Sequence, residues 1–198
     1  NKISGDGVIR VAGEVSVKSS DISDYHGEWD VLGKLKTVDG SFTTSSQWGT
    51  GNVNIEPQGS VVVTNNSNGS LFVFDNTLSG SGTLLVNFSG SENGTDLYTP
   101  TFKIQQGTTS EFTGMVELAG EKNKKVVYIL DSDELSTSGI RVSDNSVLSV
   151  GRDDSSKETF TLGKLDIAGG ELNIGDIQTG SPTSNKTIRV TKKLNADG

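Results

Sequence analysis

One short template recurs along the chain and constrains the fold more than any other feature. Each copy has a glycine, two alternating apolar positions, a turn that carries Gly or Asn, and two further alternating apolar positions. Repeats of one short unit are the sequence pattern of solenoids, propellers and arrays. The chain is therefore expected to stack repeated units. The copies begin at Gly7, Gly33, Gly51, Gly139 and Gly163, with a weaker one at Lys186.

The alternation inside each copy predicts half-buried strands. In the first copy Ile9 and Val11 would share one face of a strand and Arg10 the other, because side chains alternate with a period of two. The strands are separated by Gly-rich or Asn-rich bends, which suit residues that adopt positive φ at low cost. Bends are expected at Gly13, Gly40, Gly59, Asn145 and Gly170.

Two all-β architectures compete for this pattern. A sandwich would pair sequence neighbours through hairpins, and Asp39 followed by Gly40 fits such a turn. In a parallel β-helix each strand stacks on its counterpart one coil away. The spacing between the starts of neighbouring copies predicts coils of about 18–26 residues, which is the length typical of a β-solenoid. The reuse of one template favours an all-β parallel β-helix over residues 1–198.

Polar stretches between the strand units are expected to project as loops. One of them holds Pro100, and all interrupt the apolar alternation. The prediction is a single β-helix interrupted by loops. Any functional site is expected on these loops rather than on the regular coils. The loop excursions are placed near 19–32, 88–101, 119–125, 151–158 and 178–186.

Composition limits the chemistry and the partners. Hydrophobic residues make up 31% of the chain, which predicts a thin, distributed core. There is no Cys, so neither a disulfide framework nor a thiolate metal site is expected. The net charge of −8 argues against nucleic acid as a partner. Apolar runs of about five residues are too short for membrane insertion.

Four phrases make the chain resemble the passenger regions of adhesin-type bacterial autotransporters, the AIDA-like and pertactin-like group. They are residues 78–84, 112–118, 138–150 and 163–172. The resemblance implies a right-handed β-helix exported through the outer membrane and displayed on the bacterial surface by a C-terminal barrel. The present chain would be passenger only, and its start at Asn1 would be a cut inside a longer protein or a processed terminus.

The same resemblance implies adhesion as the function. The passenger would attach to a host-surface glycan or matrix protein, or to the same protein on another cell, and so promote autoaggregation, biofilm and virulence. The alternatives are a β-helix enzyme acting on polysaccharide and a passive spacer. We expect no enzyme and no cofactor, because His26 is the only histidine and no nucleophile motif occurs.

One cluster of aromatic and acidic residues is a candidate binding site. Tyr25, His26 and Trp29 lie among four acidic residues, and aromatics with hydrogen-bonding neighbours suit carbohydrate or protein contact. The alternative is that Trp29 plugs an end or a side of the rod. His26 could also act as a general base beside Ser23 or Asp24, although we do not expect catalysis there.

Asn65, Asn66 and Asn68 form a second candidate site. Asn and Ser side chains at equal positions of stacked coils can form hydrogen-bonded ladders, which offer a flat surface for self-association.

Two sets of charged residues could have either a functional or a purely structural role. The acidic turns at 131–134 and 153–154 are expected to be solvated, with no metal. Arg141, Asp166 and Arg189 occupy outward positions in successive templates. They could belong to an enzyme cleft, and cross-coil salt bridges explain them equally well.

Overall fold

Strands dominate the computed structural model of the chain. It describes residues 2–37, 48–65, 71–88, 101–104, 111–120, 126–130, 135–150, 158–174 and 186–197. Among them the only helix is the short α1 (Ser19–Ile22).

Three sheets form the walls of the molecule. Sheet 1 is β2 (Val8–Val11), β5 (Glu28–Val31), β7 (Val53–Ile55), β10 (Leu78–Gly80) and β13 (Glu111–Phe112). Sheet 2 is β3 (Glu14–Val17), β6 (Lys34–Thr37), β8 (Ser60–Asn65), β11 (Thr83–Phe88), β14 (Met115–Gly120), β16 (Gly139–Ser143), β18 (Thr159–Ala168) and β20 (Thr187–Asp197). Sheet 3 is β9 (Leu71–Phe74), β12 (Thr101–Ile104), β15 (Val126–Leu130), β17 (Ser146–Val150) and β19 (Glu171–Ile174). A small pair, β1 (Ser4–Gly5) and β4 (Asp24–Tyr25), lies near the N-terminus.

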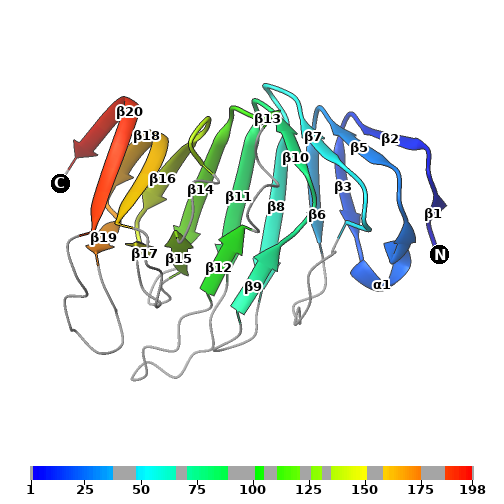
Figure 1. Cartoon of the computed structure of the whole chain (residues 1–198). Helices are drawn as coiled ribbons and strands as arrows, with labels where there is room; N and C mark the ends of the chain where they lie inside the picture. Colours follow the sequence, from blue (N-terminus) through cyan, green and yellow to red (C-terminus); the bar gives the residue numbers. More distant parts are fainter. Residues whose placement is uncertain are drawn as a thin grey trace, which may run out of the picture.

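Every named strand pairs in parallel with its counterpart one coil away, which makes the chain a parallel β-helix and confirms the predicted fold. Figure 1 shows the strands following one another along a rod, with the two termini at opposite ends. Along sheet 1, Ile9 pairs with Trp29, Trp29 with Val53, and Val53 with Leu78. The spacing of these partners along the chain lies within the expected range of coil lengths. The coils that lead in sheet 2 from Leu84 to its partner Val116, and from Leu165 to its partner Leu194, are longer than expected.

The recurring template marks a corner between two sheets, and different copies fall at different corners. The copies that begin at Gly7 and Gly51 pass from sheet 1 to sheet 2. Those that begin at Gly139 and Gly163 pass from sheet 2 to sheet 3. The spacing between copies of the template is therefore the number of residues between two corners of the rod, which need not be one coil. The length of a coil is given instead by the number of residues between register partners.

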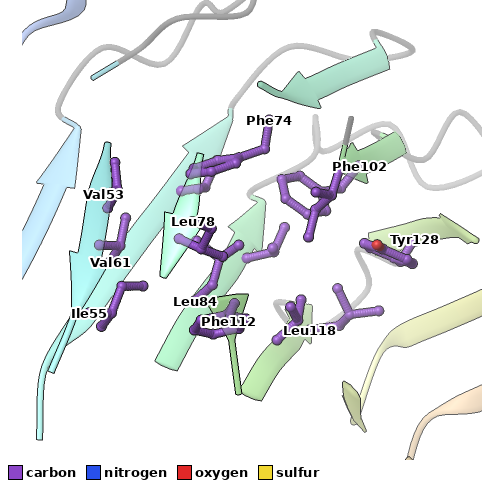
Figure 2. Packing of buried hydrophobic residues seen from close by; sticks show 14 of the residues in the cluster. Val53, Ile55, Val61, Phe74, Leu78, Leu84, Phe102, Phe112, Leu118 and Tyr128 are labelled. Carbon is purple, nitrogen blue, oxygen red and sulfur yellow. The ribbon is translucent and has the colours of Figure 1, made fainter. Parts of the chain in front are cut away.

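The core is a set of apolar columns that run along the rod. In sheet 2 one column joins equivalent positions of every strand: Val15, Leu35, Val61, Leu84, Val116, Ile140, Leu165 and Leu194. Figure 2 shows side chains from the three sheets packed together in the interior, among them Val53, Leu84 and Phe102. The burial of each such side chain stabilises the fold by roughly 1.5–3 kcal/mol before entropy is counted.

Two of the predicted bends show why the turn residues are what they are. Asn145 has the positive φ of 58° that its residue type tolerates. Gly59 does not have positive φ. It is a glycine because a Cβ there would lie 2.0 Å from the carbonyl oxygen of Val31 on the preceding coil. Close approach between coils, rather than backbone conformation, requires this residue.

One predicted loop excursion is wrong. Residues 19–32 are not a loop that projects from the rod, because α1, β4 and β5 occupy most of them and β5 is an inner strand of sheet 1. The buried side chains of Ile22, Tyr25, Trp29 and Val31 hold this segment to the core. The other four predicted excursions lie wholly or mostly outside the described residues.

Candidate functional site

Aromatic side chains fill the interior at the N-terminal end of the rod. The rings of Tyr25 and Trp29 meet edge to face with centroids 5.3 Å apart, and those of Trp29 and Trp48 do so at 6.4 Å. The indole N–H of Trp29 donates to the carbonyl oxygen of Trp48 at 2.7 Å. These contacts satisfy the polar edge of Trp29 inside the core.

The hydroxyl of Tyr25 is also satisfied internally. It lies 2.7 Å from the carbonyl oxygens of both Gly7 and Glu28, and its single proton is shared between these two acceptors. Burial raises the pKa of this phenol above its ordinary value, and the negative charge of Glu28 adds to the effect. The side chain is thus held in its neutral form by its surroundings.

Tyr25 and Trp29 therefore offer no contact surface in the folded rod. Their exposed fractions are 2% and 0%. Trp29 instead plugs the rod, which is the alternative that the sequence offered. The sequence made the aromatics candidates for binding because such residues suit carbohydrate contact. The alternation of side chains along β5 points Trp29 inward, together with Val31.

His26 is exposed and bonded to the next coil. Its Nδ1 lies 2.6 Å from Oγ1 of Thr50, and its backbone N–H donates to the carbonyl oxygen of Gly5. Ser23 donates to Asp24 instead. The structure thus pairs His26 with Thr50 on the surface of the rod rather than with either candidate triad partner.

A row of polar side chains runs along the outer face of sheet 1, and we call it the polar ladder. It consists of Arg10, Asp30, Asn54 and Ser79, which are in-register neighbours on four consecutive coils. Nε of Arg10 lies 3.6 Å from Asp30, Asn54 donates to Asp30 at 3.2 Å, and Ser79 donates to Asn54 at 3.3 Å. Each coil is thus tied to the next by an outward side chain.

The surroundings of the polar ladder are mainly acidic. Asn54 donates to Glu56 as well as to Asp30, and Glu111 continues the same row beyond Ser79. Arg10 is the positive member at the N-terminal end, and its side chain is 67% exposed. The arrangement presents amide, hydroxyl and carboxylate groups at the spacing of strands in a sheet, about 4.8 Å.

A second set of cross-coil pairs lies on the outer face of sheet 2. Arg141 and Asp166 are register partners, and the guanidinium donates to Oδ2 of Asp166 from Nη2 at 2.8 Å and from Nε at 3.0 Å. The hydrogen bond to Asp166 raises the pKa of Arg141. Arg189 does not join this row, because its register partner is Thr161. The salt-bridge explanation of Arg141 and Asp166 is confirmed.

Near the N-terminal end of the same face, Glu14 pairs with lysines of the next coil. Lys36 donates to its carboxylate, and Nζ of Lys34 lies 4.0 Å away. The hydrogen bond from Lys36, helped by the charges of Lys34 and Lys36, lowers the pKa of Glu14.

The remaining candidate residues lie outside what the structure describes. The backbone of Asn65 ends β8, but its side chain, Asn66 and Asn68 are among these residues, as are the acidic turns at 131–134 and 153–154. Within the described ranges, no group of three or more acidic or histidine side chains could hold a metal ion.

Sequence inspection missed the polar ladder, although its members occupy the central outward position of each sheet 1 strand. That signal becomes visible only when the register between strands, rather than the template, aligns one coil with the next.

Comparison with family models, curated protein sequences and solved structures finds no match to this chain. Within the described part of the chain, no helix has the length and apolar character needed to cross a membrane.

Proposed function

We propose that this β-helix is part of a bacterial cell-surface adhesin, exported through the outer membrane, which binds ligands along its outer faces. The ligand would be a host-surface glycan, a matrix protein or the same protein on another cell. The observation that carries the proposal is the polar ladder, a preformed row of hydrogen-bonding groups across four coils.

The physical argument rests on preorganisation. The groups of the polar ladder are held by one another and by the sheet, so little conformational entropy is lost when a ligand binds. A flat row that repeats at the strand spacing can contact an extended chain of sugars or an extended peptide at several points. Weak contacts of this kind add up along a rod through multivalency.

Charge narrows the class of ligand. The chain has a net charge of −8, and Asp30, Glu56 and Glu111 lie on or beside the polar ladder. Like charge disfavours sulfated or sialylated glycans. Neutral glycans and basic segments of matrix proteins are the favoured ligands.

The test is display of the chain on cells, with measurement of settling and of attachment to immobilised neutral oligosaccharides and matrix proteins. The variant Asn54→Ala with Ser79→Ala removes two members of the polar ladder. A matched control, Asn87→Ala with Ser143→Ala, removes the same residue types from half-buried outward positions of sheet 2. We expect attachment or settling to fall at least about tenfold in the first variant alone.

Two outcomes would contradict the proposal. Equal behaviour of the two variants would mean that the polar ladder binds nothing. Equal behaviour of cells with and without the chain would favour the passive spacer.

A further inference from the structure

The outer face of sheet 2 carries a column of side chains whose order is complementary to its own reverse. The column consists of Lys36, Val62, Leu85 and Glu117, which are register partners on β6, β8, β11 and β14. Along the rod it reads as a cation, two apolar side chains and an anion. In the opposite direction it reads as an anion, two apolar side chains and a cation. We call it the self-complementary column.

The middle of this face is uncharged. β8 and β11 contain no charged residue, and Val62 and Leu85 point outward from them. Val62 is 5% exposed and Leu85 is half-buried, so the two belong to a closely packed surface layer. Apolar side chains rimmed by polar and charged residues are typical of a protein contact surface. This layer can pack against a second uncharged layer without burying an unpaired charge.

The charges at the two ends of the self-complementary column are available for such a contact. Arg141, the register partner of Glu117 on the next coil, directs its guanidinium to Asp166, so Glu117 is left without an ion pair among the described residues. Lys36 donates to Glu14, and its side chain remains 33% exposed. An ammonium group has three protons to donate, so Lys36 can bind a second carboxylate while it keeps the first.

The neighbouring strands extend the same complementarity. From β3 to β16 the strands of sheet 2 carry, in order, one anion, two cations, no charge, no charge, one anion and one cation. When this order is reversed, the anion of β3 meets the cation of β16, and the cations of β6 meet the anion of β14. Every charged strand of this stretch would therefore meet a strand of opposite charge, and opposite charges that face each other set the register of a contact.

We propose that two copies of this chain form a symmetric dimer in which the outer faces of sheet 2 pack against each other. The two-fold axis runs parallel to the strands, between β8 and β11. Val62 of each copy then faces Leu85 of the other, and Lys36 of each copy faces Glu117 of the other. The strands of the two sheets run in the same direction, as in aligned sheet packing, and the two rods run antiparallel.

The same surface serves both copies, so the contact is isologous and closes at two molecules. The self-complementary column lies on four inner strands of sheet 2 and involves neither end of the rod. It is also separate from the polar ladder, which lies on the outer face of sheet 1. The dimer therefore goes beyond the proposed function, and each of the two can fail without the other.

Sedimentation of the purified full chain, at concentrations up to about 1 mM, tests the proposal, because this range reveals even weak association. We expect a monomer that converts to a dimer as the concentration rises, with no larger species. The measurement needs no ligand, so its result does not depend on what the polar ladder binds.

A charge swap tests the predicted register. Lys36→Glu and Glu117→Lys should each weaken dimerisation at least about tenfold, because each places like charges opposite each other. The double variant Lys36→Glu with Glu117→Lys should restore the dimer, and so should an equimolar mixture of the two single variants. Lys164→Glu is the control: it makes the same charge change on the outer face of β18, beyond the contact, and should have little effect.

An apolar position supplies an independent test. Leu85→Glu places a charge in the centre of the contact and removes the burial of one Leu, so dimerisation should weaken at least about tenfold. Val73→Glu is the matched control, because Val73 is a half-buried outward residue on β9 of sheet 3. Melting curves establish that each variant is folded.

A wild-type chain that stays monomeric over the whole range of concentrations would overturn the proposal. Species that keep growing beyond the dimer would do the same, since an isologous contact closes. The register would be refuted by a double variant that dimerises no better than the single charge variants, or by equal weakening in Leu85→Glu and Val73→Glu.

Discussion

The indole N–H of Trp29 donates to the backbone carbonyl of Trp48, further along the chain, at 2.7 Å. This bond joins the second coil to the segment that leads into the third, inside the core. The indole N–H of Trp48 is also buried, but it has no hydrogen-bond partner among the described residues. The two tryptophans thus share one aromatic cluster, but among the described residues only the indole N–H of Trp29 has a hydrogen-bond partner.

This difference predicts unequal effects of the same substitution. Trp29→Phe removes a donor and leaves the carbonyl oxygen of Trp48 buried without it, a loss of about 1–3 kcal/mol beyond the lost packing. Trp48→Phe removes a donor that was unsatisfied. Urea denaturation should therefore show a larger loss of unfolding free energy for Trp29→Phe, and equal losses would contradict the assignment.

Gly59 is predicted to be intolerant of even a methyl group. Its Cβ would lie 2.0 Å from the carbonyl oxygen of Val31, so Gly59→Ala must push two coils apart. Gly13→Ala is the control, because a Cβ there meets nothing within 4 Å. Thermal melting should show clear destabilisation at position 59, and little change or a gain of about 0.4–1 kcal/mol at position 13. Similar melting of the two variants would contradict the coil spacing.

The pair formed by Arg141 and Asp166 should matter more than the exposed pair formed by Lys36 and Glu14. Asp166 is only 5% exposed, so Arg141→Gln leaves a buried carboxylate without its charged partner at a cost of about 1–3 kcal/mol. Lys36→Gln removes an ion pair to the exposed carboxylate of Glu14, which solvent screens, and should destabilise the fold less than Arg141→Gln does. Chemical denaturation of the two variants measures the difference. A cost at Lys36 that equals the cost at Arg141 would refute the assignment.

Tyr25 predicts a loss of stability at alkaline pH. Its pKa in the folded state lies above the ordinary value of 10.0, so folding favours the protonated phenol. That contribution is complete below the ordinary pKa and is lost as the pH rises through the pKa of the folded state. Denaturation over a series of alkaline pH values should show a steeper fall for the wild type than for Tyr25→Phe. Parallel slopes would mean that Tyr25 does not contribute.

Much of the fold could be predicted because the strands obey a simple alternation. Ile9, Val11, Leu165 and their equivalents fall on stacked strands, and the reuse of one template predicted the parallel stacking. The coil boundaries could not be predicted, because copies of the template mark different corners of the rod. Sheet 3 departs from the alternation as well: Val127, Ile129 and Val147 are buried although they lie outside the main core cluster.

The candidate site was less predictable, because side chains alternate between the two faces of a strand. Whether an aromatic residue binds a ligand or fills the core depends on the face it occupies, and one residue of register decides that. On β5 the side chain of Glu28 points outward, so that of the next residue, Trp29, points inward. His26 lies before this strand begins and stays exposed. The polar ladder depends on register between coils, which residue spacing in the template does not supply.

Cysteine cross-linking tests the parallel β-helix most directly, because the chain has no Cys of its own. Asn54 and Ser79 are register partners on adjacent coils, whereas Asp30 and Ser79 are two coils apart. Adjacent strands lie about 4.8 Å apart, so a disulfide can join them, whereas strands two coils apart are too distant for a disulfide. Mild oxidation should close a disulfide in Asn54→Cys with Ser79→Cys and not in Asp30→Cys with Ser79→Cys. The opposite result, or no difference between the two pairs, would contradict the stacking of coils on which the account depends.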